Sequence, residues 1–213
     1  MRLAAICTGR AQPIKAKSGR TGHFKVPQAG AVNVTPKGAE GDVIVDTAHH
    51  GGPDQAIYLL GEADRLWWQS TLNTPLPAGF MGENMLIDAL DSADLALGDR
   101  LEVGTVTLQI TAPRVPCVTF AARIGDPGGV KRFLASGHPG AYARVLRSGA
   151  VSAFDPVRHM PIDSDRISVV DHLRRYAQKD MDAAYLRRLL TIPAHYGMHE
   201  LARHHLGEDA ERD

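Results

Sequence analysis

The stretch Arg100–Cys117, RLEVGTVTLQITAPRVPC, decides the fold. Apolar and polar residues alternate on both sides of Gly104, which is the pattern of two strands that each bury one face. Gly98-Asp99 precedes the pattern, and Pro113 ends it because proline cannot donate a ladder hydrogen bond. The pattern predicts a strand pair over Arg100–Ala112, followed by a stiff loop that carries Arg114 and Cys117.

Short apolar runs on either side of this pair indicate more β structure. The expected strands are Leu3–Thr8, Ala31–Thr35, Gly41–Asp46, Ala141–Arg147 and Val151–Val157. Two helices are expected among them, at Glu62–Ser70 and Val130–Ser136. Many short strands in one unit predict a mainly β fold, a closed or nearly closed barrel with peripheral helices over residues 1–160.

The composition changes after Pro161, where helical spacing replaces alternation. Ser168 has the position of an N-cap, and helices are expected over 169–177, over 181–190 and over 198–206, ending near Gly207. Residues 165–213 are therefore predicted to form a small three-helix appendage. A DNA-binding helix-turn-helix is disfavoured, because the arginine pairs of this segment fit solvated helix faces better.

Composition excludes several classes of protein. The 213 residues include 24 Lys+Arg, 24 Asp+Glu and 10 His, so the net charge of zero disfavours nucleic acid as a partner. Two cysteines are too few for a disulfide framework or a four-thiolate zinc site. The apolar run Leu3–Cys7 is too short for a signal peptide, and no run approaches a membrane helix, so we expect a cytoplasmic protein with reduced thiols.

Cys117 is the first candidate for chemistry. The prolines at 113 and 116 fix the backbone of its loop, and Arg114 would lower the pKa of a nearby thiol. A thiol positioned in this way suits a metal ligand or a nucleophile. The alternative is a buried cysteine that fills a gap in the core.

Polar and glycine-rich clusters supply further candidates. His50 and Gly51, after His49, could bind an anion through the ring and backbone N–H groups, although an ordinary turn is the alternative. Asn84 offers an acceptor and two donors to a heterocycle edge, and the loop of Arg20 and Thr21 could hold a phosphate. The alternatives are again a turn and a solvated loop.

The C-terminal histidines superficially suggest a zinc-protease helix. In His199-Glu-Leu-Ala-Arg-His204 the second histidine falls at i+5, on another helix face, whereas that motif needs i+4. His195 and His199 have the i, i+4 spacing, but the sequence indicates no third ligand. We expect a solvated or core-edge histidine face here.

Taken in order, these fragments resemble the MOSC family, the molybdenum-cofactor sulfurase C-terminal domain, in its stand-alone bacterial YiiM-like branch. The matching segments, covering about residues 1–160, are Thr21–Lys25, Gly38–Asp42, His50–Ala56, Gly82–Asn84, Gly98-Asp99, Pro113–Cys117 and Gly140–Leu146. The three-helix segment also matches that branch. The resemblance implies a MOSC-type β-barrel that binds a molybdenum-bound pyranopterin dithiolene.

The resemblance also implies roles for individual residues. Cys117 matches the family cysteine and would ligate molybdenum as a thiolate, a soft ligand. The residues that would contact the cofactor's phosphate and pterin are Arg20, Thr21, His50, Gly51, Asn84 and Arg114. The implied activity is reduction of N-hydroxylated compounds such as hydroxylaminopurines. Electrons would come from a separate flavoprotein or reductase, because the sequence has neither a second cysteine placed for an iron–sulfur centre nor a dinucleotide fingerprint.

Other functions remain open from the sequence. In a second hypothesis Cys117 carries a persulfide and hands sulfur to another protein's metal centre or cofactor; in a third the protein binds or stores the cofactor without turnover. Pyridoxal phosphate is disfavoured, because no lysine has a context that supports an aldimine, although Lys15, Lys25 and Lys37 remain individual alternatives. The appendage could form a homodimer, cover the pocket or dock a reductase.

Overall fold

The computed structural model describes residues 1–48, 50–163 and 165–208, and its largest element is an eight-stranded sheet. In sheet order its strands are β13 (Val157–Met160), β9 (Arg100–Val103), β10 (Val106–Pro113), β11 (Ala141–Arg147), β7 (Ile57–Gly61), β8 (Met85–Ile87), β1 (Leu3–Gly9) and β4 (Lys25–Pro27). Smaller sheets are formed by β12 (Gly149–Val151), β5 (Val32–Thr35) and β6 (Gly38–Ala39), and by β2 (Gln12–Pro13) and β3 (Arg20–Thr21).

The predicted strand pair is confirmed as the β9–β10 hairpin. Val103 pairs with Val106 across the turn Gly104-Thr105, and Gly104 has the positive φ of 53° that such a tight turn favours. β10 is the longest strand of the sheet and pairs with β11 on its other side, so it carries the loop of Arg114 and Cys117 from the middle of the sheet.

The expected sheet with peripheral helices is confirmed, but the named strands do not close it into a barrel. β13 and β4 are its two edges. The start of β1 nevertheless approaches the β13 edge: Arg2 forms an isolated bridge with Pro156, and the Leu3 amide donates to the Asp155 carbonyl at 2.9 Å. The closure is therefore a local contact rather than a continuous ladder.

Two strand predictions were wrong. Residues 41–46 form a loop whose backbone bonds to β1 through one hydrogen bond, from the Val43 amide to the Gly9 carbonyl, and its three apolar side chains, Val43–Val45, are exposed. The strand expected at Val151–Val157 is two strands, β12 and β13, separated by a turn at Phe154, where φ is 73°. These two strands belong to different sheets, so the break redirects the chain.

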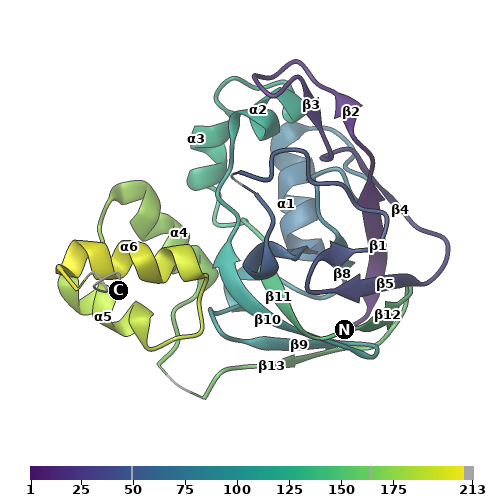
Figure 1. Cartoon of the computed structure of the whole chain (residues 1–213). Helices are drawn as coiled ribbons and strands as arrows, with labels where there is room; N and C mark the ends of the chain where they lie inside the picture. The colour runs from purple at the N-terminus through teal and green to yellow at the C-terminus, as the bar shows by residue number, and fades with distance from the viewer. Residues whose placement is uncertain (49, 164, 209–213) are drawn as a thin grey trace.

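Three helices cover one side of the large sheet and three form the appendage (Figure 1). They are α1 (Glu62–Leu72), α2 (Val118–Ile124), α3 (Gly129–Leu134), α4 (Val169–Gln178), α5 (Ala183–Leu190) and α6 (Tyr196–Leu206), with 3-10 turns η1 (Pro53–Gln55) and η2 (Ser92–Asp94). α1 and α3 confirm the expected helices, whereas α2, which begins directly after Cys117, was not predicted. α1, α2 and α3 bury Trp68, Phe120 and Phe133 against one another.

The three-helix appendage is confirmed. Ser168 caps α4, since its side chain accepts from the Asp171 amide at 3.0 Å, and Gly207 ends α6. Buried side chains of α5 and α6, among them Leu186, Leu189 and Ala202, belong to the same hydrophobic cluster as the strands of the large sheet. The appendage is therefore packed onto the sheet. No helix among the described residues is long and apolar enough to cross a membrane.

Candidate functional site

Cys117 is the N-cap residue of α2, at the end of the loop that leaves β10. Pro113 and Pro116 leave this loop few conformations, so the thiol position is fixed by the sheet on one side and the helix on the other. The side chain is half-buried, and its sulfur lies near the His50 side chain and the backbone N–H groups of Thr119 and Phe120. The expectation that Cys117 only fills a gap in the core is not supported by this partial exposure.

The surroundings of Cys117 favour the thiolate. Burial alone would raise the pKa of the thiol, but the hydrogen bond from His50, the two backbone N–H groups and the charge of Arg114 outweigh it and lower the pKa to about 6. The other cysteine, Cys7, is fully buried in β1, and burial raises the pKa of its thiol to about 12. Only one of the two sulfurs is therefore prepared for chemistry near neutral pH.

Arg114 forms a buried positive wall of the site. Its guanidinium donates to the Met81 carbonyl and lies over three aromatic rings, with its central carbon 4.9 Å from the Tyr58 centroid, 5.2 Å from Phe120 and 5.6 Å from Phe133. The rings hold the charge in place while excluding water. An anionic group that enters this cavity meets a guanidinium that is already desolvated, which strengthens their attraction.

All seven residues predicted from the sequence line one cavity. They come from four separate parts of the chain: Arg20 and Thr21, His50 and Gly51, Asn84, and the loop of Arg114 and Cys117. His49 lies outside the described residues. Arg20 is exposed at the rim and donates to the Ala11 carbonyl at 3.0 Å. The fold thus brings together every candidate residue for the cofactor, although it does not assign their contacts.

Asn84 and Gly51, like Arg20 and Arg114, already use polar groups within the protein. The Asn84 side chain accepts from the Tyr58 amide at 3.1 Å and donates to Asp42 at 2.9 Å and to the Cys7 carbonyl at 3.3 Å. The Gly51 amide donates to the side chain of Gln55 at 3.2 Å. Both therefore shape the cavity wall, and Asn84 ties Asp42 to the sheet.

Several cavity residues were not singled out from the sequence. Lys25 and Asp42 form an ion pair at 2.5 Å, and the rings of Tyr58 and Tyr142 pack at a tilt of 44° with their centroids 5.3 Å apart. His23 also lines the cavity; its Nε2 is buried and has no hydrogen-bond partner among the described residues. The sequence did hold a signal for three of them. His23 and Lys25 lie inside the quoted motif at 21–25 and Asp42 inside the one at 38–42, close in sequence to the predicted site residues.

His23 depends on the glycine beside it. A side chain at Gly82 would place its Cβ 2.8 Å from His23 Nε2, and Gly82 has a φ of 85°, which other residues rarely adopt. Burial, together with the charges of Arg114 and Arg123, lowers the pKa of His23 well below its usual value. The ring is therefore neutral, and Nε2 can exchange a hydrogen bond with a bound group.

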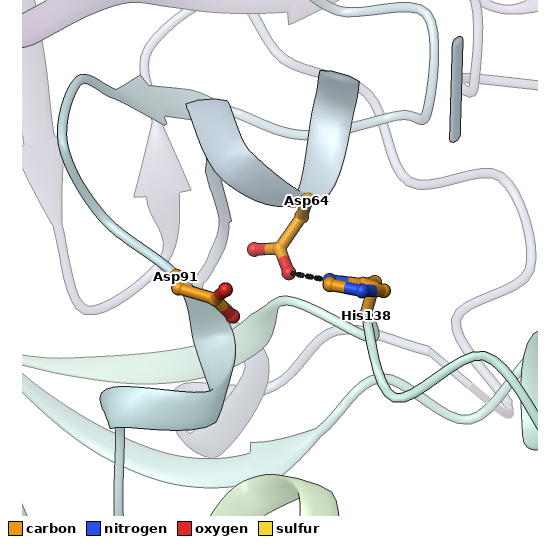
Figure 2. A group of neighbouring side chains, drawn as sticks. All are labelled: Asp64, Asp91 and His138. Carbon is orange, nitrogen blue, oxygen red and sulfur yellow. Dashed lines mark hydrogen bonds and ion pairs between the residues drawn. The ribbon is translucent and has the colours of Figure 1, made fainter. Parts of the chain in front are cut away.

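Asp64, Asp91 and His138 form the one group of possible metal ligands found among the described residues (Figure 2). Asp64 is fully buried and accepts from His138 at 3.0 Å, from Ser92 Oγ at 2.6 Å and from the Ser92 and Gly61 amides at 3.1 and 3.0 Å. These four bonds use the acceptor capacity of the carboxylate. The cluster therefore fastens α1 to η2 and to the loop before β11, and Asp64 has no lone pair left for a metal.

The C-terminal histidines also have structural roles. His195 is the N-cap of α6, and its Nδ1 accepts from the Gly197 amide at 3.0 Å. His199 Nε2 lies 2.9 Å from the Ile192 carbonyl, to which it donates. These contacts orient α6 on the appendage and agree with the expectation of a core-edge histidine face.

Comparisons with known proteins point to one family. A sequence model described as the MOSC domain matches residues 46–158. The chain is 33% identical over 132 residues to the uncharacterized protein YflK of Bacillus subtilis, covering 62% of this chain and 60% of that protein. It is 25% identical over 175 residues to a protein of Gibberella moniliformis named "Reductase", covering 80% of this chain but only 31% of that protein.

A solved structure matches nearly the whole chain. The crystal structure of YiiM from Geobacillus stearothermophilus superimposes with a TM-score of 0.79 at 25% identity, covering 96% of this chain and 98% of that one. The match includes the appendage, because it extends over almost all residues of both chains. The fold is therefore that of YiiM, three-helix segment included.

Proposed function

Because this chain belongs to the MOSC domain family, we propose that its cavity binds a molybdenum-bound pyranopterin dithiolene and that the protein reduces N-hydroxylated compounds. The observation that carries the proposal is Cys117, a half-buried thiol whose pKa is lowered to about 6 beside a buried arginine. The relative named a reductase supports an oxidoreductase activity. The chain spans less than two thirds of YflK and about a third of that reductase. The activity, the substrate and the partners given for this chain are therefore part of what we propose.

The residues present fit the proposed cofactor. Cys117 is a thiolate at neutral pH, which is the protonation state and the soft donor that molybdenum needs. Arg114 and Arg20 supply positive charge for the phosphate, whereas the charge of Lys25 is balanced by Asp42. The buried, unpartnered Nε2 of His23 offers one further hydrogen bond to a polar group of the pterin.

The chemistry divides between cofactor and chain. When bound, the cofactor supplies a metal that changes oxidation state by two electrons, as removal of one oxygen atom requires. The overall conversion consumes an N-hydroxyl compound, two electrons and two protons, and yields the amine and water. In the chain, His50 and Arg114 keep the Cys117 sulfur ionised, and the packed rings of Tyr58 and Tyr142 exclude water from their side of the cavity. A separate flavoprotein or reductase delivers the electrons.

Replacement of Cys117 tests the proposed activity. Protein from a host that makes the cofactor should reduce 6-hydroxylaminopurine when an artificial electron donor is supplied, and Cys117→Ser should abolish that reduction. Cys7→Ala is the matched control, since it removes the other thiol from a buried strand position and should leave activity in place. Activity retained by Cys117→Ser would remove this residue from the mechanism.

The same thiol supports a second candidate function. A partly exposed thiol with a low pKa is also suited to carry a persulfide for transfer to another protein's cofactor or metal centre. Mass spectrometry of the intact protein distinguishes the two functions. One additional sulfur atom on Cys117, together with no molybdenum in the protein, would favour sulfur transfer over reduction.

A further inference from the structure

A second cavity lies between the large sheet and the appendage. Its volume is about 220 Å³, and it shares three lining residues, Gln55, Val115 and Tyr142, with the cavity of Cys117. Val115 is two residues from Cys117 on the same loop and is 40% exposed. The two cavities are therefore neighbours that share a wall, and Cys117 lines the first of them.

The chemical character of the second cavity is opposite to that of the first. α5, α6 and the adjoining loop contribute aliphatic and methionine side chains, namely Met181, Leu186, Leu189, Met198 and Leu201. No Lys, Arg, Asp or Glu lines it among the residues that the structure describes. Its two histidines are neutral near pH 7, because burial lowers the pKa of His172 to about 4 and lowers that of His195 as well.

Contacts between the sheet and the appendage hold the two walls of this cavity in a fixed relative position. Asp54 of η1 accepts from the Tyr196 amide at 2.8 Å and forms an ion pair with Arg144 at 2.9 Å. Arg144 in turn donates to the Ala194 carbonyl at 2.7 Å. Since η1 lies directly before β7 and Arg144 is on β11, these bonds fix the start of α6 to the strands that carry the thiol cavity.

We propose that the second cavity binds the uncharged, apolar or aromatic body of the substrate, so that its N-hydroxyl group extends past Val115 toward Cys117. An apolar cavity of about 150 Å³ accommodates a benzene ring, so this one has room for a larger ring system. The tyrosine and histidine rings of the wall can stack on a planar group, and the methionines adapt to its outline. That the reacting group is an N-hydroxyl rests on the proposed function. The preference of the cavity for uncharged ligands is independent of that function, because it follows from the lining residues.

Direct binding to the full chain tests this subsite without turnover. The probe is benzamidoxime, a neutral N-hydroxylated ring compound. 4-Carboxybenzamidoxime has the same N-hydroxylated group and adds a negative charge on the far side of the ring; both are titrated by calorimetry into cofactor-free protein. The test variant is Leu201→Trp, which places a large ring at the cavity from a residue that is 43% exposed. Leu146→Trp is the matched control, since Leu146 is 46% exposed and is outside the cavity lining.

We expect benzamidoxime to bind the wild type and Leu146→Trp equally, and Leu201→Trp at least about tenfold more weakly. 4-Carboxybenzamidoxime should bind the wild type at least about tenfold more weakly than benzamidoxime, because the second cavity offers the carboxylate on the far side of the ring no partner. Equal affinity of Leu201→Trp and the wild type, or a preference for 4-carboxybenzamidoxime, would overturn the subsite. Binding as expected without any reduction would instead contradict the proposed function alone, and reduction with a KM unaffected by Leu201→Trp would contradict the subsite alone.

Discussion

Replacement of His50 by alanine should make the thiol of Cys117 markedly less acidic. The pKa of this thiol is lowered from 9.0 to about 6, which corresponds to ~4 kcal/mol in favour of the thiolate. The hydrogen bond from His50 is the largest contribution that favours the thiolate, and a hydrogen bond to a charged group contributes ~1.5–3 kcal/mol. His50→Ala should therefore raise the pKa of Cys117 by roughly one to two pH units, with Arg114 and the backbone N–H groups retaining the rest.

The assay is the rate of alkylation by iodoacetamide as a function of pH, since only the thiolate reacts. The rate for the wild type should rise as the pH increases through about 6 and then level off, and the rise for His50→Ala should occur at higher pH. Cys7 serves as an internal control, because it is buried and should stay unmodified until the protein unfolds. Peptide mapping assigns the modified residue.

His205→Ala is the matched control, because His205 is an exposed histidine of α6 outside the cavity. It should leave the titration of Cys117 unchanged. A wild-type midpoint near 9, or the same midpoint in the wild type and in His50→Ala, would refute the assignment of His50 as the group that stabilises the thiolate.

Three further substitutions test how the fold supports the cavity. Gly82→Ala should destabilise the protein by more than about 1 kcal/mol in urea unfolding, because it combines a positive φ with a clash against His23; an unchanged midpoint would contradict this. Burial raises the pKa of Glu83 to about 7, so between pH 4.5 and 7 the folded wild type retains a proton that the unfolded chain has lost. The stability of the wild type should therefore fall, relative to that of Glu83→Gln, as the pH rises from 4.5 to 7. Parallel stability profiles of the two proteins would contradict this. Ser168→Ala should cost ~1 kcal/mol through loss of the α4 cap, and no loss in thermal unfolding would show that water replaces the cap.

The sequence predicted those parts of the fold that have strong local signals. The β9–β10 hairpin has alternation on both sides of Gly104, and α4 has a capping serine. Helix α2 was missed because it begins directly after the proline-containing loop, at Cys117, without the capping side chain that marks the start of α4. Residues 41–46 are apolar in sequence yet form a loop, since strand formation depends on a pairing partner that local sequence does not reveal.

The motifs predicted which residues line the candidate site, but they did not predict the contacts that these residues make. Seven residues chosen from four segments line one cavity, yet the Asn84 amide bonds to Asp42 and to the backbone of Tyr58 and Cys7. The unpartnered Nε2 of His23 could not be foreseen, because it depends on the packing of the ring against Gly82. The second cavity arises between two segments that are far apart in the chain, and no local pattern encodes it.

The most direct measurement of the central claim is the molybdenum content of the full chain purified from a host that makes the cofactor. The account predicts about one molybdenum per wild-type chain and a large loss of metal in Cys117→Ser, with Cys7→Ala retaining the wild-type content. Wild-type protein without molybdenum under these conditions would contradict the account, as would Cys117→Ser with undiminished metal.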